Sequence, residues 1–161
     1  ELVQDKSRFL ALNCQTNSNN HGFNLINRQY RKADSFSLDQ MEISLACANP
    51  RPDFPLELKK LQKYFHARYA WLTRGSIETL GIKSGGKGCS CPPFETNIID
   101  TIGAGDAFTA TASLAAVSGL SINLATFMGQ LAGAQAVRIV GNSESIKKGK
   151  FLKSGEAMLN L

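Results

Sequence analysis

The sequence predicts an α/β fold, a three-layer α/β/α sandwich in which helices cover both faces of a mostly parallel sheet. Short apolar runs at residues 8–13, 35–38 and 69–73 have the length of buried strands, and helical segments separate them. Strands that alternate with helices pair in parallel through crossover helices. The chain has 161 residues, of which 43% are hydrophobic, so we expect one domain spanning residues 1–161.

The first crossover segments are short. After the strand at residues 8–13, a polar loop covers residues 14–21 and a helical segment begins near Gly22. Residues 39–47 follow the second strand as a helix, with Met41 and Leu45 four residues apart on one face.

The next helix is predicted from its apolar spacing. Prolines at 50 and 52 force an irregular connection, and Pro55 fits the first helical turn. The helix runs through His66 with an amphipathic pattern. Its apolar side consists of Leu58, Leu61 and Phe65.

Beyond the third strand the period changes to that of a hairpin. Residues 79–83 and 89–94 flank the glycine-rich turn at 84–88. The GxxxxGKG spacing of residues 81–88 is one hydroxyl short of a P-loop, and it precedes CSCPP where a helix should begin, so a hairpin turn is the better interpretation.

The last elements are a short strand and two helices. Ile98 and Ile99 form a strand that ends in Asp100. Asp106 opens a helix of small and apolar residues that Gly119 closes. A second helix, with Ser121 as its cap, runs toward Val137 and stops before Gly141.

Charge and hydropathy argue against two function classes. The net charge of +5 is spread along the chain, and its one small lysine cluster, between residues 147 and 153, is expected to be a solvated face rather than a nucleic-acid site. Without an uninterrupted run of eighteen apolar residues we expect no membrane span. The four cysteines form no CxxC pair and no His stands at zinc-finger spacing, so we expect no structural metal site. No signal peptide is visible, so reduced thiols in a cytoplasmic protein are expected.

The glycine-rich segment at residues 103–106, GAGD, is the strongest candidate for chemistry. Backbone N–H groups of Gly103, Ala104 and Gly105 can point into one concavity at the positive end of a helix dipole, which makes an anion hole. A carboxylate at Asp106 would repel a phosphate there unless it handles a proton. A helix-capping role explains Asp106 equally well. The spacing of residues 103–108 also starts like a dinucleotide fingerprint, but Phe108 stands where a small residue is needed, so a nicotinamide enzyme is remote.

The longer segment at residues 100–108, DTIGAGDAF, resembles the C-terminal signature of the ribokinase-like (PfkB) carbohydrate kinases. The resemblance implies transfer of the γ-phosphoryl group of ATP, with Mg²⁺, to a sugar hydroxyl. It gives Asp106 the role of general base and residues 103–105 that of stabilising charge on the transferring phosphate. Asp100 and Thr101 fall among the nucleotide-binding residues by the same resemblance.

The rest of the chain is similar to the C-terminal half of that family. Thr73 and Gly75 match its nucleotide-contacting turn. The segment Asp39 to Glu42 resembles its Asn-x-x-Glu element, which implies that Glu42 orders metal and phosphate; Asp39 departs from the usual Asn. Gln130 falls where the family places an Asn near the adenine.

Each of these positions also has a structural interpretation. Glu42 can be an ordinary exposed carboxylate at a helix start, and the glycine- and alanine-rich helix around Gln130 can serve close packing. Asn13 and Gln15 lie at the end of the first strand, where open parallel sheets bind ligands, but a polar loop there needs no function.

The resemblance covers only about the second half of a family member. It implies that the N-terminal part and the lid lie outside this sequence, so that the chain is part of a longer polypeptide and inactive by itself. The loop QTNSNN at residues 15–20 is closer to kinases of the heptose-nucleotide pathway than to ribokinase. A sugar and ATP are the expected partners, a homodimer is left open, and the alternative is a nucleotide-binding module without turnover.

Overall fold

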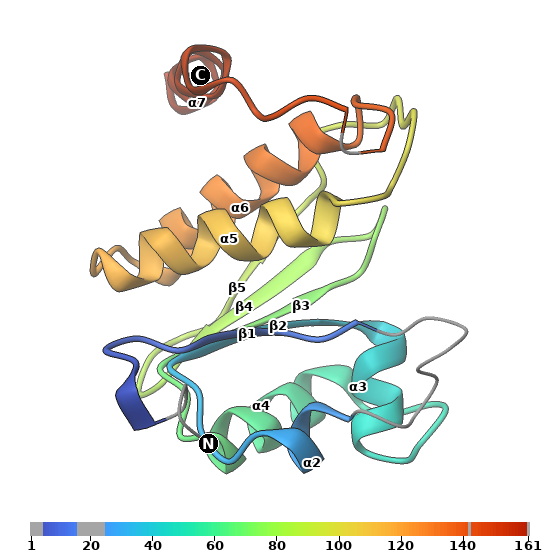
Figure 1. Ribbon diagram of the computed structural model, residues 1–161, viewed down its shortest axis with the longest axis vertical. Coiled ribbons are helices and arrows are strands. Elements are labelled where there is room, and N and C mark those ends of the chain that lie inside the picture. Colours follow the sequence, from blue (N-terminus) through green and yellow to red (C-terminus); the bar gives the residue numbers. More distant parts are fainter. Residues whose placement is uncertain (1–4, 16–24, 142, 161) are drawn as a thin grey trace.

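The computed structural model describes residues 5–15, 25–141 and 143–160 and has the predicted α/β architecture (Figure 1). Its sheet is five-stranded within these residues, in the order β1-β2-β3-β4-β5. The first three strands pair in parallel, and β4 and β5 extend the sheet as an antiparallel hairpin, so the sheet is mixed. The strands are β1 (Ala11–Asn13), β2 (Ser35–Asp39), β3 (Tyr69–Thr73), β4 (Thr79–Lys83) and β5 (Cys89–Cys91).

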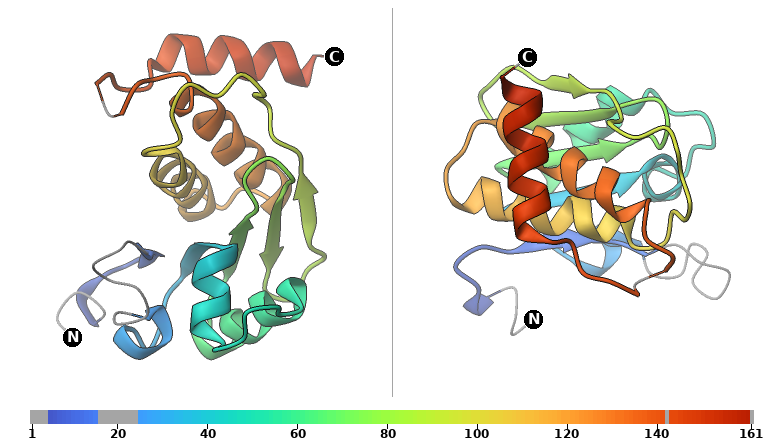
Figure 2. Two further views of the ribbon diagram at one scale, coloured as in Figure 1. Left: turned by 90° about the vertical axis from the view of Figure 1, so that its right-hand side faces the viewer. Right: turned by 90° about the horizontal axis from the view of Figure 1, so that it is seen from above.

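Helices cover both faces of this sheet, which confirms the three-layer sandwich (Figures 1 and 2). One face carries α2 (Ile26–Gln29), α3 (Gln40–Ala46) and α4 (Phe54–Tyr64), and the other carries α5 (Ala104–Val117) and α6 (Ile122–Ala136). A last helix, α7 (Lys148–Leu159), lies on the outer side of α6.

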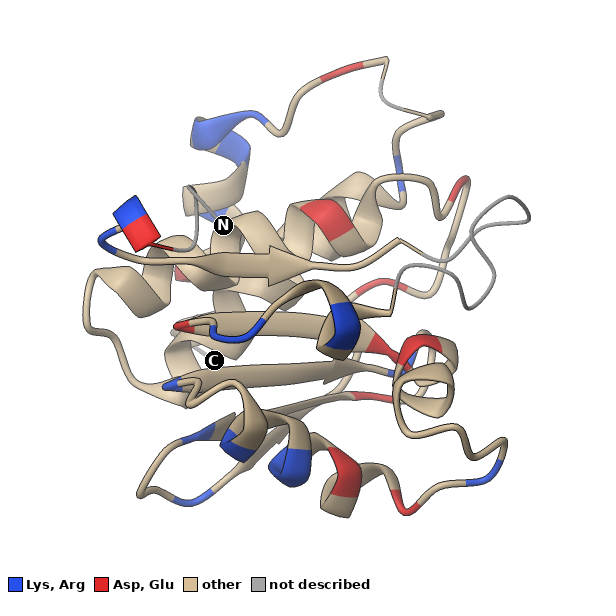
Figure 3. Cartoon of the chain, turned by 60° about the horizontal axis from the view of Figure 1, so that its bottom comes forward, with Lys and Arg blue, Asp and Glu red and all other residues tan. Residues whose placement is uncertain are grey.

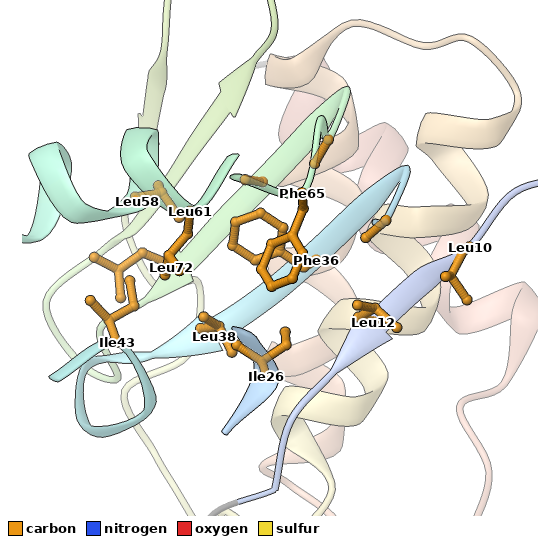
Figure 4. Packing of buried hydrophobic residues seen from close by; sticks show 13 residues of the cluster. Leu10, Leu12, Ile26, Phe36, Leu38, Ile43, Leu58, Leu61, Phe65 and Leu72 are labelled. Carbon is orange, nitrogen blue, oxygen red and sulfur yellow. The ribbon is translucent and has the colours of Figure 1, made fainter. Parts of the chain in front are cut away.

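Two apolar cores hold the layers together. The core under α2, α3 and α4 is built on β2 and β3, with Phe36 and Phe65 in edge-to-face contact at 5.3 Å between ring centroids (Figure 4). The core under α5 and α6 contains Tyr69, Trp71 and Phe108. Strand β3 contributes to both, because its side chains alternate between the two faces.

Most elements lie where the sequence predicts them. The bounds of β3 and β4 are as predicted, β2 is one residue longer, and β1 and β5 are shorter. The glycine-rich segment after β4 is a hairpin turn with Gly85 in the left-handed region at φ 71°, which confirms the hairpin and argues against a P-loop. The predicted helix start near Gly22 lies outside the described residues.

The predicted strand at Ile98 and Ile99 is wrong. The N–H groups of Ile99 and Asp100 donate to the Val137 carbonyl at 2.8 and 3.1 Å, so this stretch is tied to the end of α6 instead of to a neighbouring strand. Both isoleucines are about half exposed, at 48% and 55%. These two apolar residues therefore belong to an irregular surface segment and not to a strand.

Met41 and Leu45, which the sequence places on one face of α3, do not mark the face that packs against the core. Met41 is 52% exposed, whereas Glu42 and Ile43 are buried. Ile43 packs into the core beneath the sheet. The helix has seven residues, so a single pair at i and i+4 is a weak guide to the side that faces the core.

Charge is distributed as the sequence predicts. Lys and Arg residues are spread over several elements (Figure 3). None of the described helices has the length and hydropathy of a membrane span.

Helices α5 and α6 approach closely at a glycine. A Cβ atom added to Gly129 would lie 2.6 Å from Cε2 of Phe108 and 3.0 Å from Cβ of Ala112. The small residues of α6 thus serve close packing, which is the structural interpretation considered for this helix.

Replacing Gly129 with Val should lower the free energy of unfolding by about 1–3 kcal/mol, because overpacking displaces the Phe108 ring. Gly149→Ala is the matched control: its added Cβ has no heavy atom within 4 Å, so no loss is expected. Urea denaturation measures both variants. Equal stability of the Gly129→Val and Gly149→Ala variants would contradict the packing argument.

Candidate active site

A cavity of about 680 Å³ opens at the carboxyl ends of the three parallel strands. Asn13 ends β1, Asp39 ends β2 and Thr73 ends β3, and all three line it. The N-terminal turn of α5 and one side of α6 complete the walls. Open α/β sheets bind ligands at this edge, because the loops that follow parallel strands gather there.

The cavity brings together most of the residues that the sequence singles out. Two predicted residues, Asp100 and Gly103, do not line it. Those that do are Glu42, Thr73, Gly75, Thr101, Ala104, Gly105, Asp106 and Gln130.

The start of α5 differs from the prediction. The helix begins at Ala104, and Gly103 is its N-cap in the left-handed conformation at φ 80°. Glycine adopts this conformation without steric cost, so the loop can turn directly into the helix two residues earlier than predicted. Asp106 therefore lies within the first turn and is not the capping residue.

One of the three backbone N–H groups predicted to form an anion hole is already engaged. The N–H group of Ala104 already donates to the Thr101 carbonyl at 3.2 Å. The first N–H groups of a helix have no acceptor within the helix, and no acceptor for those of Gly105 and Asp106 lies in the described part of the chain. Gly105 and Asp106 both line the cavity.

The carboxylate of Asp106 has one side-chain partner from a distant part of the sequence. Its Oδ1 accepts a hydrogen bond from Nδ2 of Asn13 at 2.7 Å, across a separation of 93 residues. Sequence reasoning left Asn13 without a role. The only signal was its position at the carboxyl end of the first strand.

Glu42 and Asp39 form a reciprocal capping box at the start of α3. The Glu42 N–H donates to Oδ1 of Asp39 at 2.8 Å, and the Asp39 N–H donates to Oε2 of Glu42 at 2.8 Å. Asp caps a helix about as well as Asn, which explains the departure at position 39. Glu42 is buried, so its interpretation as an exposed carboxylate is wrong, and its role toward a metal stays a prediction.

The turn after β3 is held rigidly beside the cavity. Gly75 has φ 54°, in the left-handed region that favours glycine. The Arg74 guanidinium donates to Oε1 of Glu78 at 2.6 Å, and the Arg74 N–H donates to the Glu78 carbonyl at 2.9 Å. Hydrogen bonds from the Ser90 hydroxyl and the Arg74 guanidinium keep the pKa of Glu78 below its usual value. Thr73 and Gly75 are thus fixed in the cavity wall.

Asp100 shapes the loop that precedes α5. Its carboxylate accepts hydrogen bonds from the N–H groups of Ile102 at 2.9 Å and Gly141 at 2.7 Å. These bonds lower its pKa, because they favour the charged form. Asp100 therefore ties the loop to the segment after α6, while its neighbour Thr101 lines the cavity.

Gln130 connects α6 to the chain that leaves β5. Its Nε2 donates to the Pro92 carbonyl at 3.2 Å. The residue also lines the cavity.

The sequence and the fold both match known proteins. Residues 25–148 match the family model of the pfkB family carbohydrate kinases. Ribokinase from Thermotoga maritima is similar in structure, with a TM-score of 0.76 and 16% identity over 99% of this chain and 52% of that chain. Arabidopsis thaliana ribokinase complexed with ribose and ATP has a TM-score of 0.73 and 20% identity over 89% of this chain and 46% of that chain. Phosphofructokinase-2 from Escherichia coli has a TM-score of 0.68 and 19% identity over 81% of this chain and 42% of that chain.

The chain spans about half the length of these solved structures or less. No curated protein matches the sequence. These findings lend no support to the predicted closeness to heptose-nucleotide kinases.

Proposed function

Because the chain belongs to the pfkB family of carbohydrate kinases, we propose that it forms the nucleotide-binding and phosphoryl-transfer part of an ATP-dependent sugar kinase. One observation carries the proposal. Asp106 lines the cavity from the first turn of α5, where the backbone N–H groups of Gly105 and of Asp106 itself have no acceptor among the described residues. A proton acceptor and donors for an anion thus share one helix N-terminus.

In the proposed reaction Asp106 takes the proton of a sugar hydroxyl. The hydroxyl oxygen forms a bond to the γ-phosphorus of ATP while the bond from that phosphorus to the bridging oxygen breaks, and ADP leaves with the electron pair. The N–H groups of Gly105 and Asp106 donate to the phosphoryl oxygens, where charge is concentrated in the transition state. The positive end of the α5 dipole acts in the same direction.

Glu42 and Asp39 are suited to a magnesium ion that arrives with the nucleotide. Mg²⁺ is held in such sites by one or two carboxylates, water and substrate phosphates. The described residues contain no group of three His, Cys, Asp or Glu side chains that could hold a metal without phosphate, which fits this mode of binding. When bound, the ion would neutralise phosphate charge, and we propose that Glu42 orders it through water.

The nucleotide would lie between the turn after β3 and α6. Thr73 and Gly75 form one wall, Thr101 the second and Gln130 the third, and all four line the same cavity. Arabidopsis thaliana ribokinase, which shares the fold, has been solved with ribose and ATP, and this supports a sugar and ATP as the two ligands. Asp100 and Gly103 would contribute by shaping the loop.

The sugar-recognising segment and the lid are proposed to belong to further polypeptide. Phosphoryl transfer depends on positioning and exclusion of water, so this chain alone should turn over poorly. The four cysteines, all within the described residues, form no disulfide, which agrees with the proposed cytoplasmic enzyme.

Calorimetry followed by a turnover assay tests the proposed function. The chain should bind Mg·ATP, and a polypeptide that contains it should release ADP when a sugar is added, with ribose and other pentoses, hexoses and hexose phosphates as probes. Binding without sugar-dependent release on any of them would favour a non-catalytic nucleotide-binding module. Absence of Mg·ATP binding would contradict both functions.

Replacing Glu42 with Gln should weaken binding of Mg·ATP by about tenfold, because the carboxylate charge that orders the ion is lost. Gln keeps an acceptor for the Asp39 N–H, so the capping box and the free energy of unfolding should change little.

The matched control is Glu57→Gln, a first-turn glutamate of α4 that does not line the cavity. Calorimetry with and without Mg²⁺ separates the effects: the loss in the Glu42 variant should be seen only with the metal. An equal loss for ATP in EDTA would show that Glu42 acts on the nucleotide pocket and not on the ion.

A further inference from the structure

The hydrogen bond between Asn13 and Asp106 joins two rigid elements at the reacting carboxylate. Asn13 ends β1 and is held in register opposite Ser37 of β2. Asp106 stands in the first turn of α5, two residues before Phe108, which is buried against Trp71. Both side chains are exposed at the cavity, with Nδ2 and Oδ1 2.7 Å apart.

We propose that Asn13 is a positioning residue for phosphoryl transfer, whose amide group fixes the rotamer of Asp106 and presents Oδ2 to the acceptor hydroxyl. The proposal rests on the proposed function, since it assigns Asp106 its proton-accepting role. A carboxylate on an exposed helix turn otherwise samples several rotamers, and misplacement of a reacting group by about 1 Å can cost on the order of 10²-fold in rate.

The chemistry of an amide suits this task. The Asn side chain donates a hydrogen bond to a carboxylate, yet it carries no charge and does not ionise near neutral pH. It therefore neither competes with Asp106 for the proton nor neutralises it, as a lysine or arginine would. Because Oδ1 is engaged by Asn13, the orientation of Oδ2 becomes fixed as well.

A purely structural role for this bond predicts a different outcome. An exposed hydrogen bond contributes only about 0.5–1.5 kcal/mol to stability. Asn27 offers a comparison, because its Nδ2 donates to the Ala46 carbonyl at 2.9 Å in a part-buried bond and it does not line the cavity. Loss of either bond should lower stability, whereas only Asn13 should affect turnover.

Kinetics on a polypeptide that contains this chain test the proposal, with ribose as the phosphoryl acceptor. If ribose is not a substrate, hydrolysis of ATP, with water as the acceptor, is measured instead. Asn13→Ala should lower kcat by on the order of 10- to 10²-fold with little change in the KM for ATP. Asn27→Ala should leave kcat unchanged. In the Asp106→Asn background, Asn13→Ala should cause no further loss, because it acts through the missing carboxylate.

The outcomes separate this proposal from the proposed function. Full activity of Asp106→Asn would overturn the proposed function. Loss of activity in Asp106→Asn together with an unchanged kcat in Asn13→Ala, or additive losses in the double variant, would overturn the positioning role alone. A spectroscopic measurement does not depend on turnover: the ¹⁵N side-chain signals of Asn13 should shift in Asp106→Ala and stay in place in Asp5→Ala. Unshifted signals in Asp106→Ala would overturn the contact itself.

Discussion

Replacing Asp106 with Asn should lower kcat for phosphoryl transfer by about 10²–10⁴-fold, the range that a positioned general base contributes. Asn has the same shape and keeps an oxygen that accepts the hydrogen bond from Asn13, but it does not take up the proton of a hydroxyl. Stability should change by only about 0.3–1 kcal/mol, because the substitution removes one negative charge from the first turn of a helix.

The cap of α5 gives a second reason for a small effect on stability. Gly103 caps α5, so Asp106 contributes no capping bond that Asn would have to replace. Asp53→Asn is a suitable control, since Asp53 caps α4 by accepting the Leu56 N–H at 3.1 Å and lies outside the cavity. Both variants should unfold at nearly the same urea concentration as the parent protein, and only Asp106→Asn should lose turnover. If Asp106→Asn retains turnover, Asp106 is structural and the proposed reaction is wrong.

The fold was predictable where the apolar pattern determines burial. Strand β3 is a continuous run of buried side chains, and its predicted and observed bounds agree because it is covered on both faces. Ile98 and Ile99 have the same local character, yet their backbone bonds go to the end of α6. Composition alone does not distinguish a strand from an irregular segment whose backbone is hydrogen-bonded to a helix terminus.

Helix α7 was not predicted, because it has no clear apolar stripe. Gly155 is its one buried residue among those described, and a Cβ there would lie 3.3 Å from Cδ2 of Leu131. A close helix contact through glycine leaves almost no hydrophobic signal in the sequence.

The candidate site was predictable only in part. Asp39 and Thr73 follow buried strands, so their gathering at one edge follows from parallel pairing. The bond from Asn13 to Asp106 depends on the separation of β1 and α5, which no local pattern encodes. The start of α5 depends on the positive φ of Gly103. Every glycine can adopt this conformation, so the sequence alone does not tell which glycine does.

Replacing Trp71 with Ala should lower the free energy of unfolding by about 3–5 kcal/mol, the usual cost of removing a large buried aromatic side chain. Trp71 is fully buried on β3 and meets Phe108 edge-to-face at 6.1 Å between ring centroids. It also stacks on Tyr69 at 6.0 Å, and its Nε1 donates to Oγ1 of Thr126 at 2.9 Å. The substitution would leave a cavity between the sheet and α5 and remove one partner of a buried hydroxyl.

This loss should reach the site as well as the core, because Phe108 supports the turn that carries Asp106. Trp71→Phe keeps a ring against Phe108 and loses the bond to Thr126, so it should be destabilised by only about 1–3 kcal/mol. Tyr64→Ala removes an aromatic side chain that is 50% exposed, and it should cost less than Trp71→Ala. Urea denaturation ranks the three variants, and calorimetry with Mg·ATP below the unfolding transition reports on the cavity. Equal losses of stability in Trp71→Ala and Tyr64→Ala would contradict the packing argument for Trp71, and unchanged Mg·ATP binding by Trp71→Ala would mean that the layer between β3 and α5 does not support the N-terminus of α5.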